Sequence, residues 1–106
     1  MRYFYEPVQE YITSGVAENV HGYLLLKCIE MLACMKEQGI EPDYLQVYHL
    51  SYNAQEKVFT IRHSQEEPDY EKEISFNLPF GVEPYTGKLY YIDDVDHRTF
   101  LLAEEY

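Results

Sequence analysis

Four side chains that could bind a metal ion are crowded into five residues near the C-terminus: Asp93, Asp94, Asp96 and His97. Two of these aspartates and Glu105 have the spacing of the first, third and last ligands of a calcium-binding loop. The middle of the loop does not fit, because Arg98 places a cation where a ligand oxygen belongs and Thr99 replaces the glycine of the sharp turn. Aspartate also favours turns, so we interpret this cluster as a solvated turn, with a weak surface cation site as the alternative. The sequence therefore predicts no metal site and no cofactor.

Two further groups of residues have side chains of the kinds found in metal-binding or catalytic sites. His49 and His63 are predicted to lie on the same face of a hairpin, but no third ligand shares that face. Cys34 or Ser14 could act as a nucleophile only if the fold delivered His97 to it. The sequence has neither a Gly-x-Ser-x-Gly elbow nor a glycine-rich phosphate loop. We therefore expect structural histidines and a protein that is not an enzyme.

The clearest signal is an acidic, tyrosine-rich composition. The chain has 19 acidic and 8 basic residues, a net charge of −11, and 12 tyrosines without any tryptophan. Eleven of the acids but only three of the cations lie in residues 66–106. Tyrosine gives large contact area at little entropic cost, so an acidic sheet face rich in tyrosine is the candidate interaction surface. Its residues are Glu66, Glu67, Asp69, Tyr70, Glu71, Tyr44, Tyr48 and Tyr52. A solvated sheet face that uses tyrosine for its β-propensity explains the same pattern.

The charge also limits the class of partner. A net charge of −11 repels nucleic acid and anionic lipid, so we expect no direct binding to nucleic acid or to a membrane. The favoured hypothesis is a small domain that binds another protein, with a basic face, or a second copy of itself. The alternatives are an acidic decoy that occupies the nucleic-acid site of a DNA-binding protein and, with less support, a small-ligand binder or a metal-dependent enzyme.

Hydrophobic periodicity predicts one main helix over Asn19–Gln38. Its apolar residues recur at helical spacing and are Leu24, Cys28, Met31, Leu32 and Met35. Gly39 is expected to end the helix in a left-handed conformation, while Ser14 and Asn19 are both candidate N-caps. The two cysteines, Cys28 and Cys34, are separated along this helix by a rise of about 9 Å, too far for a disulfide. Both are therefore expected to be free thiols.

Segments rich in β-branched and aromatic residues predict strands around this helix. They are Tyr11–Thr13, Tyr44–Tyr52, Val58–Gln65, Glu73–Leu78, Leu89–Ile92 and Thr99–Ala103. A run of strands after one helix favours an α+β fold, in which the helix packs on a mostly antiparallel sheet of about five or six strands. We expect Tyr52 to pair with Val58 in a hairpin. The face that seats the helix is then predicted to carry Leu45, Val47, Phe59 and Ile61.

The length of the chain predicts one domain over residues 1–106, with residues 1–10 either part of it or a loosely attached extension. The longest apolar stretch, around Leu24–Leu26, is far too short to cross a bilayer, and no signal-peptide pattern is present. Together with the unpaired cysteines, these features lead us to expect a cytoplasmic protein.

Several strings of the chain resemble a known protein family. They are Tyr11-Ile-Thr-Ser-Gly-Val16, Tyr44-Leu-Gln-Val-Tyr-His-Leu50, His63-Ser-Gln-Glu-Glu-Pro-Asp-Tyr70, Tyr91-Ile-Asp-Asp-Val-Asp-His97 and Leu101-Leu-Ala-Glu-Glu-Tyr106. In this order they are similar to short acidic proteins of low-GC Gram-positive bacteria, a family catalogued among staphylococcal proteins of unknown function. The resemblance covers residues 11–106 and implies a bacterial cytosolic context. It implies no activity, no cofactor and no functional residue.

Overall fold

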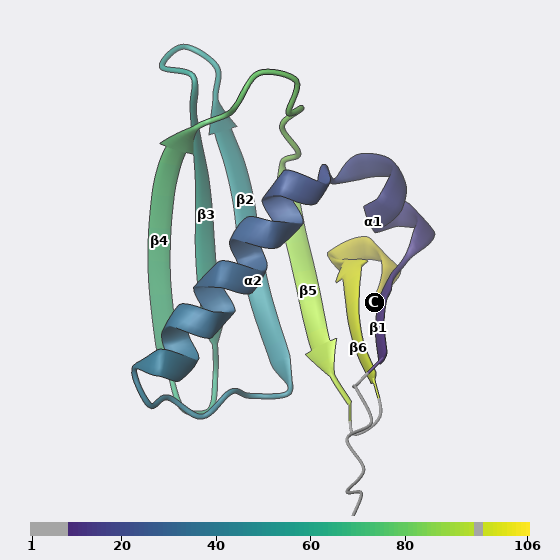
Figure 1. Cartoon of the computed structure of the whole chain (residues 1–106), viewed down its shortest axis with the longest axis vertical. Helices are drawn as coiled ribbons and strands as arrows, with labels where there is room; N and C mark the ends of the chain where they lie inside the picture. Colours follow the sequence, from purple (N-terminus) through teal and green to yellow (C-terminus); the bar gives the residue numbers. More distant parts are fainter. Residues whose placement is uncertain (1–8, 95–96) are drawn as a thin grey trace, which may run out of the picture.

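A six-stranded sheet carries one long helix on one of its faces (Figure 1). The computed structural model describes residues 9–94 and 97–106. The helices are α1 (Ser14–Asn19) and α2 (Gly22–Glu37), and a short 3-10 helix, η1 (Ala103–Glu105), follows the last strand. The strands are β1 (Gln9–Ile12), β2 (Leu45–Asn53), β3 (Val58–Gln65), β4 (Tyr70–Asn77), β5 (Gly87–Asp93) and β6 (His97–Leu102). The predicted α+β fold with one main helix is confirmed.

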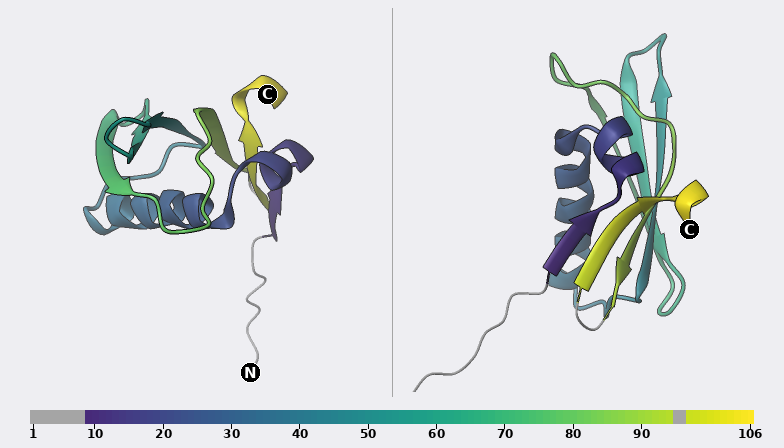
Figure 2. Two further views of the ribbon diagram at one scale, coloured as in Figure 1. Left: turned by 90° about the horizontal axis from the view of Figure 1, so that it is seen from above. Right: turned by 90° about the vertical axis from the view of Figure 1, so that its right-hand side faces the viewer.

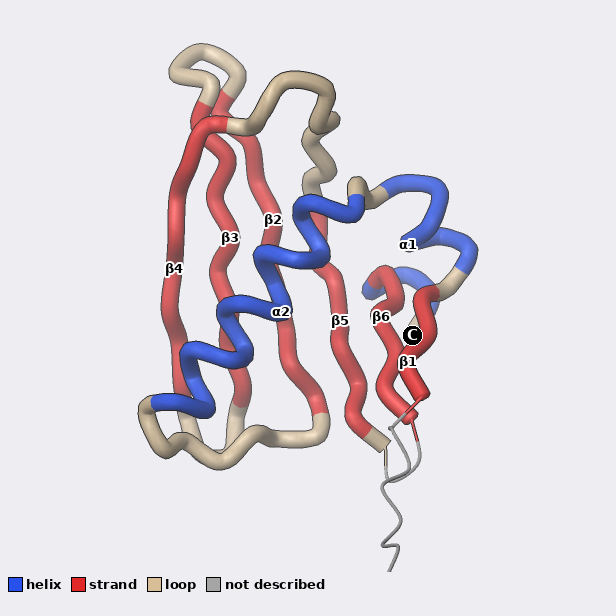
Figure 3. The backbone as a smooth tube through the Cα atoms, in the orientation of Figure 1, coloured by secondary structure: helices blue, strands red, loops and turns tan. Residues whose placement is uncertain are grey.

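The strand order across the sheet is β1-β6-β5-β2-β3-β4. All neighbouring strands are antiparallel except β1 and β6, which run parallel with Ile12 beside Phe100. These two strands come from opposite ends of the sequence, as the purple and yellow ribbons of Figure 1 show. The helix α2 lies diagonally over the sheet from β5 toward β4, so β6 and β1 extend beyond it (Figure 3).

The helix α2 buries the apolar stripe that its periodicity predicts. Its buried residues are Leu24, Cys28, Met31, Leu32 and Met35. The predicted start at Asn19 is wrong, because the helical conformation is interrupted between Asn19 and Gly22 and the preceding residues form α1 as a separate helix. The N-cap of α2 is His21, whose Nδ1 accepts a hydrogen bond of 3.0 Å from the backbone N–H of Tyr23. Thr13 caps α1, so neither Ser14 nor Asn19 is a cap.

The end of α2 follows the prediction. Gly39 lies just past the helix with φ of 83°, a left-handed conformation that glycine adopts without strain. Both cysteines of the helix are free: Cys28 is buried against the sheet and Cys34 is half-buried.

The β2–β3 hairpin differs from its predicted register by one residue. Tyr52 pairs with Phe59, not with Val58, because a four-residue turn closes the hairpin with Lys57 in a left-handed conformation (φ 59°). A shift of one residue moves side chains to the other face of a strand. Phe59 and Ile61 lie under α2 as expected. Leu45 and Val47 lie on the opposite, open face, so their assignment to the helix-bearing face is wrong.

His49 and His63 consequently lie on opposite faces of the sheet, and their predicted pairing is wrong. His49 lies opposite Arg62, whose Nη2 is 3.1 Å from the Nδ1 of His49. His63 lies opposite Tyr48 and is fully buried, with the two rings stacked at a centroid distance of 4.5 Å. The two imidazoles therefore cannot share a metal ion.

A chain of hydrogen bonds between buried amides holds His63 in place. Its Nε2 lies 2.6 Å from the Oε1 of Gln46, and the Nε2 of Gln46 donates to the Oε1 of Gln65 over 2.7 Å. The amide of Gln65 then donates to the backbone oxygens of Glu41 and Pro68. Because Gln46 presents its oxygen, His63 donates from Nε2, and its buried Nδ1 has no partner within the described residues. Burial lowers the pKa of His63 to about 4, so the network holds a neutral imidazole.

Glu105 fastens η1 to the start of α1. Its Oε1 accepts hydrogen bonds from the Oγ1 of Thr13 (2.6 Å) and the backbone N–H of Leu102 (2.9 Å), and its Oε2 accepts one from the N–H of Gly15 (3.2 Å). The bonds from Thr13, Leu102 and Gly15 lower the pKa of Glu105. A Cβ on Gly15 would lie 2.5 Å from this carboxylate, so glycine permits the close approach. The carboxylate of Glu105, which has the spacing of the last ligand of a calcium-binding loop, therefore accepts hydrogen bonds from other residues of the chain.

Candidate functional site

The structure divides the predicted interaction surface between the two faces of the sheet. Tyr48 is fully buried and its hydroxyl donates to a backbone oxygen of α2 over 3.0 Å, so its assignment to a surface is wrong. Tyr52 and Tyr70 are half-buried on the same face and pack against the core. Glu71 follows Tyr70 and lies on the other face, where its Oε2 is 3.3 Å from the Nε of Arg62. The predicted tyrosines and acids therefore do not form one face.

The remaining residues of the predicted surface are all exposed: Glu66, Glu67, Asp69 and Tyr44. The three acids lie in the turn between β3 and β4, and the tyrosine immediately precedes β2. Asp43 joins the two segments, since its Oδ2 accepts a bond of 3.1 Å from the N–H of Glu67. A hydrogen bond with Tyr106 raises the pKa of Tyr44. This acidic end of the sheet is a solvated cluster beside one exposed aromatic ring.

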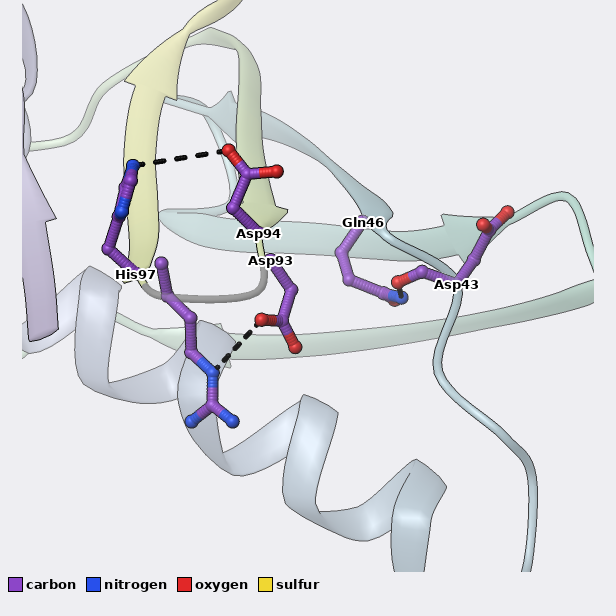
Figure 4. Close-up of polar contacts among 6 residues, drawn as sticks. Asp43, Gln46, Asp93, Asp94 and His97 are labelled. Carbon is purple, nitrogen blue, oxygen red and sulfur yellow. Dashed lines mark hydrogen bonds and ion pairs between the residues drawn. The ribbon is translucent and has the colours of Figure 1, made fainter. Parts of the chain in front are cut away.

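The carboxylates of the predicted C-terminal turn lie beside the side chains of Arg98 and His97 (Figure 4). The Oδ1 of Asp93 is 3.3 Å from the Nε of Arg98, and the Oδ2 of Asp94 is 3.9 Å from the Nε2 of His97. Asp96 lies outside the described residues. Across residues 9–94 and 97–106, no three His, Cys, Asp or Glu side chains gather in a way that could hold a metal ion.

An apolar groove of about 180 Å³ lies between α2 and the edge strand β1. Its lining residues are Glu10, Tyr11, Ile12, Leu25, Ile29, Tyr91 and Phe100. Tyr91 and Phe100 are almost fully buried and belong to the core under α2, so they form the floor. Leu25 and Ile29, one helical turn apart, form one wall, and the residues of β1 form the other. We call this recess the α2–β1 groove.

Exposed apolar side chains concentrate around the α2–β1 groove. Seven large hydrophobic side chains are exposed in the described chain, and two of them, Ile12 and Ile29, line the groove with exposures of 49% and 40%. The ring of Tyr11 alternates to the other face of β1, where its centroid lies 5.6 Å from that of His97. Leu26, 53% exposed, is the neighbour of Ile29 across one turn of α2. Single exposed apolar residues are ordinary on protein surfaces, whereas a contiguous group indicates a binding surface.

The groove exists because one helix cannot cover the whole sheet. Six strands spaced by about 4.8 Å span about 24 Å, whereas a helix with its side chains is about 10 to 12 Å wide. The two views of Figure 2 show α2 on one face of the sheet, with the short α1 beside the upper part of β6 and β1. Among the described elements, no helix lies beside α2 over the lower part of these two strands.

Carboxylates surround the lower end of the groove. Glu10 lines it and is the register partner of Arg98, which also lies within 3.3 Å of Asp93. Two carboxylates, of Glu10 and Asp93, therefore accompany one permanent cation, whereas Asp94 lies beside His97 on the other side of the sheet. Burial raises the pKa of the Tyr91 phenol in the floor, and the negative charges of Glu10 and Asp93 act in the same direction. The apolar groove therefore opens toward a negatively charged end.

The other flank of α2, toward β4, has a recess of about 190 Å³ whose lining includes three charged side chains. Its lining residues are Lys27, Glu30, Met31, Cys34, Lys72 and Ile74. The Nζ of Lys27 lies 3.6 Å from the Oε1 of Glu30 and above the rings of Tyr23 and Phe76, at 5.4 Å and 5.5 Å from their centroids. The lysine stem thus covers aromatic surface on this flank.

The sequence contains part of the signal for the groove, and our prediction did not use it. Leu25 and Ile29 are spaced i, i+4, and Leu26 and Ile29 are spaced i, i+3, so a second apolar stripe runs beside the core stripe. A helix that covers a single sheet face does not need this extra apolar surface. The β1 side of the groove has no local signal, since it depends on the pairing of β1 with the distant β6.

None of the described helices combines the length and the apolar character that crossing a membrane requires.

No curated protein matches this chain. A crystal structure of a protein of unknown function from Enterococcus faecalis is similar in fold, with a TM-score of 0.67 and 22% identity over 93% of this chain and 91% of that chain. The model of the family described as "Staphylococcal protein of unknown function (DUF960)" matches residues 9–105. The resemblance found in the sequence is confirmed, and this protein belongs to that family of staphylococcal proteins of unknown function.

Proposed function

We propose that this protein is a non-enzymatic domain that binds another protein through the α2–β1 groove. The observation that carries the proposal is the exposed apolar surface of Ile12 and Ile29 on the two walls of this recess, with Leu26 one turn of α2 from Ile29. Removing such surface from water when a partner docks favours association. The proposal keeps the expected kind of function and moves it from the sheet face to the groove.

The size of the groove favours a protein partner over a small ligand. Sites that enclose a small molecule are typically clefts of about 300 to 1,000 Å³ that bury most of the ligand. The α2–β1 groove has about 180 Å³ and lies at a sheet edge, where its wall residues Ile12 and Ile29 remain partly exposed. A partner that covers both walls removes more apolar surface from water than a molecule held inside the recess.

The surroundings of Cys34 support a role other than catalysis. Its Sγ receives hydrogen bonds from the Nζ of Lys72 at 3.6 Å and the Nε2 of Gln38 at 3.8 Å. His97, the histidine that the nucleophile hypothesis required, lies beside Asp94 instead. The nucleophile hypothesis paired this thiol with a histidine base, and the described hydrogen bonds of its Sγ come from an amine and an amide instead.

The acidic-decoy alternative receives less support from the same charges. A decoy needs a row of free carboxylates at phosphate-like spacing. Glu71 lies beside Arg62, Asp93 lies beside Arg98, and the carboxylate of Glu105 accepts bonds from the chain itself. The acidic residues thus divide among several surfaces, and some are already paired.

A charge placed in the groove tests the proposal. Ile29→Glu introduces a carboxylate at the groove wall, and Phe80→Glu makes the same change at a fully exposed residue between β4 and β5 that does not line the groove. Both variants and the wild-type protein are used to capture proteins from a lysate of the cells that produce it. Candidates are then purified and titrated by calorimetry, with circular dichroism as the check on folding.

We expect a partner that binds the wild-type protein and Phe80→Glu equally and binds Ile29→Glu at least about tenfold more weakly. If every captured protein binds the two variants alike, the α2–β1 groove is not the interaction surface.

A further inference from the structure

We infer that the α2–β1 groove receives one amphipathic helix of the partner, with basic residues at the end that meets Glu10 and Asp93. The inference rests on the proposed function and adds the chemistry of the partner. It follows from the shape of the groove and from the charges at the groove's lower end.

The shape of the groove matches a helix. Its floor is the sheet, through Tyr91 and Phe100, and one wall is the α2 row of Leu25 and Ile29. Helices pack by placing one row of side chains into the space beside the i, i+4 row of a neighbour. The sheet is about 24 Å wide and α2 covers about 10 to 12 Å of it, so the remaining width fits one further helix.

An added strand fits less well. A strand that joins the sheet beside β1 gains backbone hydrogen bonds but lies in the plane of the sheet, so it leaves the α2 wall at Leu25 and Ile29 uncovered. A helix contacts both the α2 wall and the floor, which is the apolar surface that needs covering.

The charges distinguish a basic helix from a second copy of this chain. Two carboxylates, of Glu10 and Asp93, and the guanidinium of Arg98 lie at the lower end of the groove, and the whole chain carries a net charge of −11. A symmetric pair of copies brings two chains of this charge together and places equal carboxylate clusters against one surface. Lysine or arginine on a partner helix neutralises the same carboxylates and speeds the encounter.

Two peptides with identical apolar faces test the inference. Each has about 18 residues, so that a helix can form, with leucine at i, i+3, i+4 and i+7 positions. One carries lysine on its polar face and at its ends, and the other carries glutamate there. Binding of the labelled peptides is measured by fluorescence anisotropy with the wild-type chain, Ile29→Glu, Phe80→Glu and Glu10→Gln.

We expect the lysine peptide to bind the wild-type chain and Phe80→Glu alike and to bind Ile29→Glu at least about tenfold more weakly, although that variant is more negative. Glu10→Gln should weaken only the lysine peptide. The glutamate peptide should bind the wild-type chain at least about tenfold more weakly than the lysine peptide, and this difference should shrink when the salt is raised from about 0.1 M to about 1 M.

Equal binding of the lysine peptide to Ile29→Glu and Phe80→Glu overturns the inference, because the attraction is then purely electrostatic and does not depend on the groove. Equal binding of both peptides overturns the basic character of the partner. If neither peptide binds while a cellular partner depends on Ile29, the proposed function stands and the helix is the wrong element. A wild-type dimer in sedimentation that Ile29→Glu dissociates identifies a second copy as the occupant and also overturns the inference.

Discussion

The two flanks of α2 have recesses of nearly equal size, about 190 Å³ toward β4 and about 180 Å³ toward β1, yet three charged side chains line the first and one lines the second. On the β4 flank, Lys27 lies over two aromatic rings and its charge pairs with Glu30. On the β1 flank, Leu25 and Ile29 face Ile12 across the groove. The lysine stem covers apolar surface on the first flank, and the second flank leaves such surface exposed. Side-chain choice on one helix thus decides which of its sides is available to a partner.

The largest effect is expected from the core stripe between the two flanks. Leu24→Ala should lower the free energy of unfolding by about 3 to 5 kcal/mol, because Leu24 is fully buried and its loss leaves a cavity between α2 and the sheet. Ile29→Ala on the β1 flank is the control and should cost about 1 kcal/mol, since its side chain is partly exposed. Urea titrations measure both values. Equal losses would mean that the β1 flank belongs to the core.

Acid should destabilise the protein through His63, the cross-strand neighbour of Lys72 beneath the β4 flank. The folded-state pKa is about 4 and the unfolded value is 6.5, so the unfolded state binds more protons between them. The contribution of the neutral imidazole is therefore complete above about pH 6.5 and is lost as the pH falls toward 4, a change on the order of 3 kcal/mol.

Urea titrations of the wild-type protein between about pH 7 and pH 5 measure this loss. His63→Gln should remove most of the pH dependence in this range. His49→Gln, on the open face of the sheet, should leave it in place. A wild-type protein whose stability is constant over the range would show that the imidazole is not held neutral.

A smaller effect is expected from the lysine that covers the β4 flank. Lys27→Ala should lower the free energy of unfolding by about 0.5 to 1 kcal/mol, because it removes the stem and the cation above Tyr23 and Phe76. Lys27→Met keeps a stem of similar length and should recover most of the loss in urea titrations. A Lys27→Met loss as large as that of Lys27→Ala would assign the effect to the charge instead of the cover.

The smallest effect concerns the thiols, whose labelling should leave stability almost unchanged. In the folded protein a thiol reagent should modify Cys34, which lines the β4 recess, and leave Cys28 unmodified. Burial raises the pKa of the Cys28 thiol, so the reactive thiolate is scarce there. Thiol counting before and after denaturation checks this, and two reactive thiols in the folded state would contradict the orientation of α2.

The core side of α2 could be predicted from sequence because it depends only on spacing within one helix. Leu24 and Met35 belong to the same stripe whatever lies beneath them. The sheet register could not be predicted in the same way, since it depends on how the chain turns between β2 and β3. Position 57 has a left-handed backbone conformation but carries lysine, not the glycine or asparagine that usually indicates such a turn. The predicted register therefore omitted this turn residue and assigned the wrong face of β2 to the helix.

The same exchange explains the errors in the candidate site. Tyr44, just before β2, and Tyr48, within it, have the same parity along the chain, and composition alone cannot tell a buried tyrosine from an exposed one. The turn acids Glu66 and Glu67 were correctly expected to be at the surface, because charged residues in turns are rarely buried. The groove was missed because its walls meet only after β1 and β6 have paired.

This pairing also sets the moment at which the protein becomes able to bind. Among the described strands β1 has one neighbour in the sheet, β6, so on the ribosome β1 waits for that partner until residues 97–102 have been synthesised. Contacts between distant segments form late because the loop between them must first be closed. A chain cut short before β6 by a premature stop or by a protease therefore retains the apolar residues of α2 but never acquires the second wall. Such fragments should not compete with the complete protein for its partner.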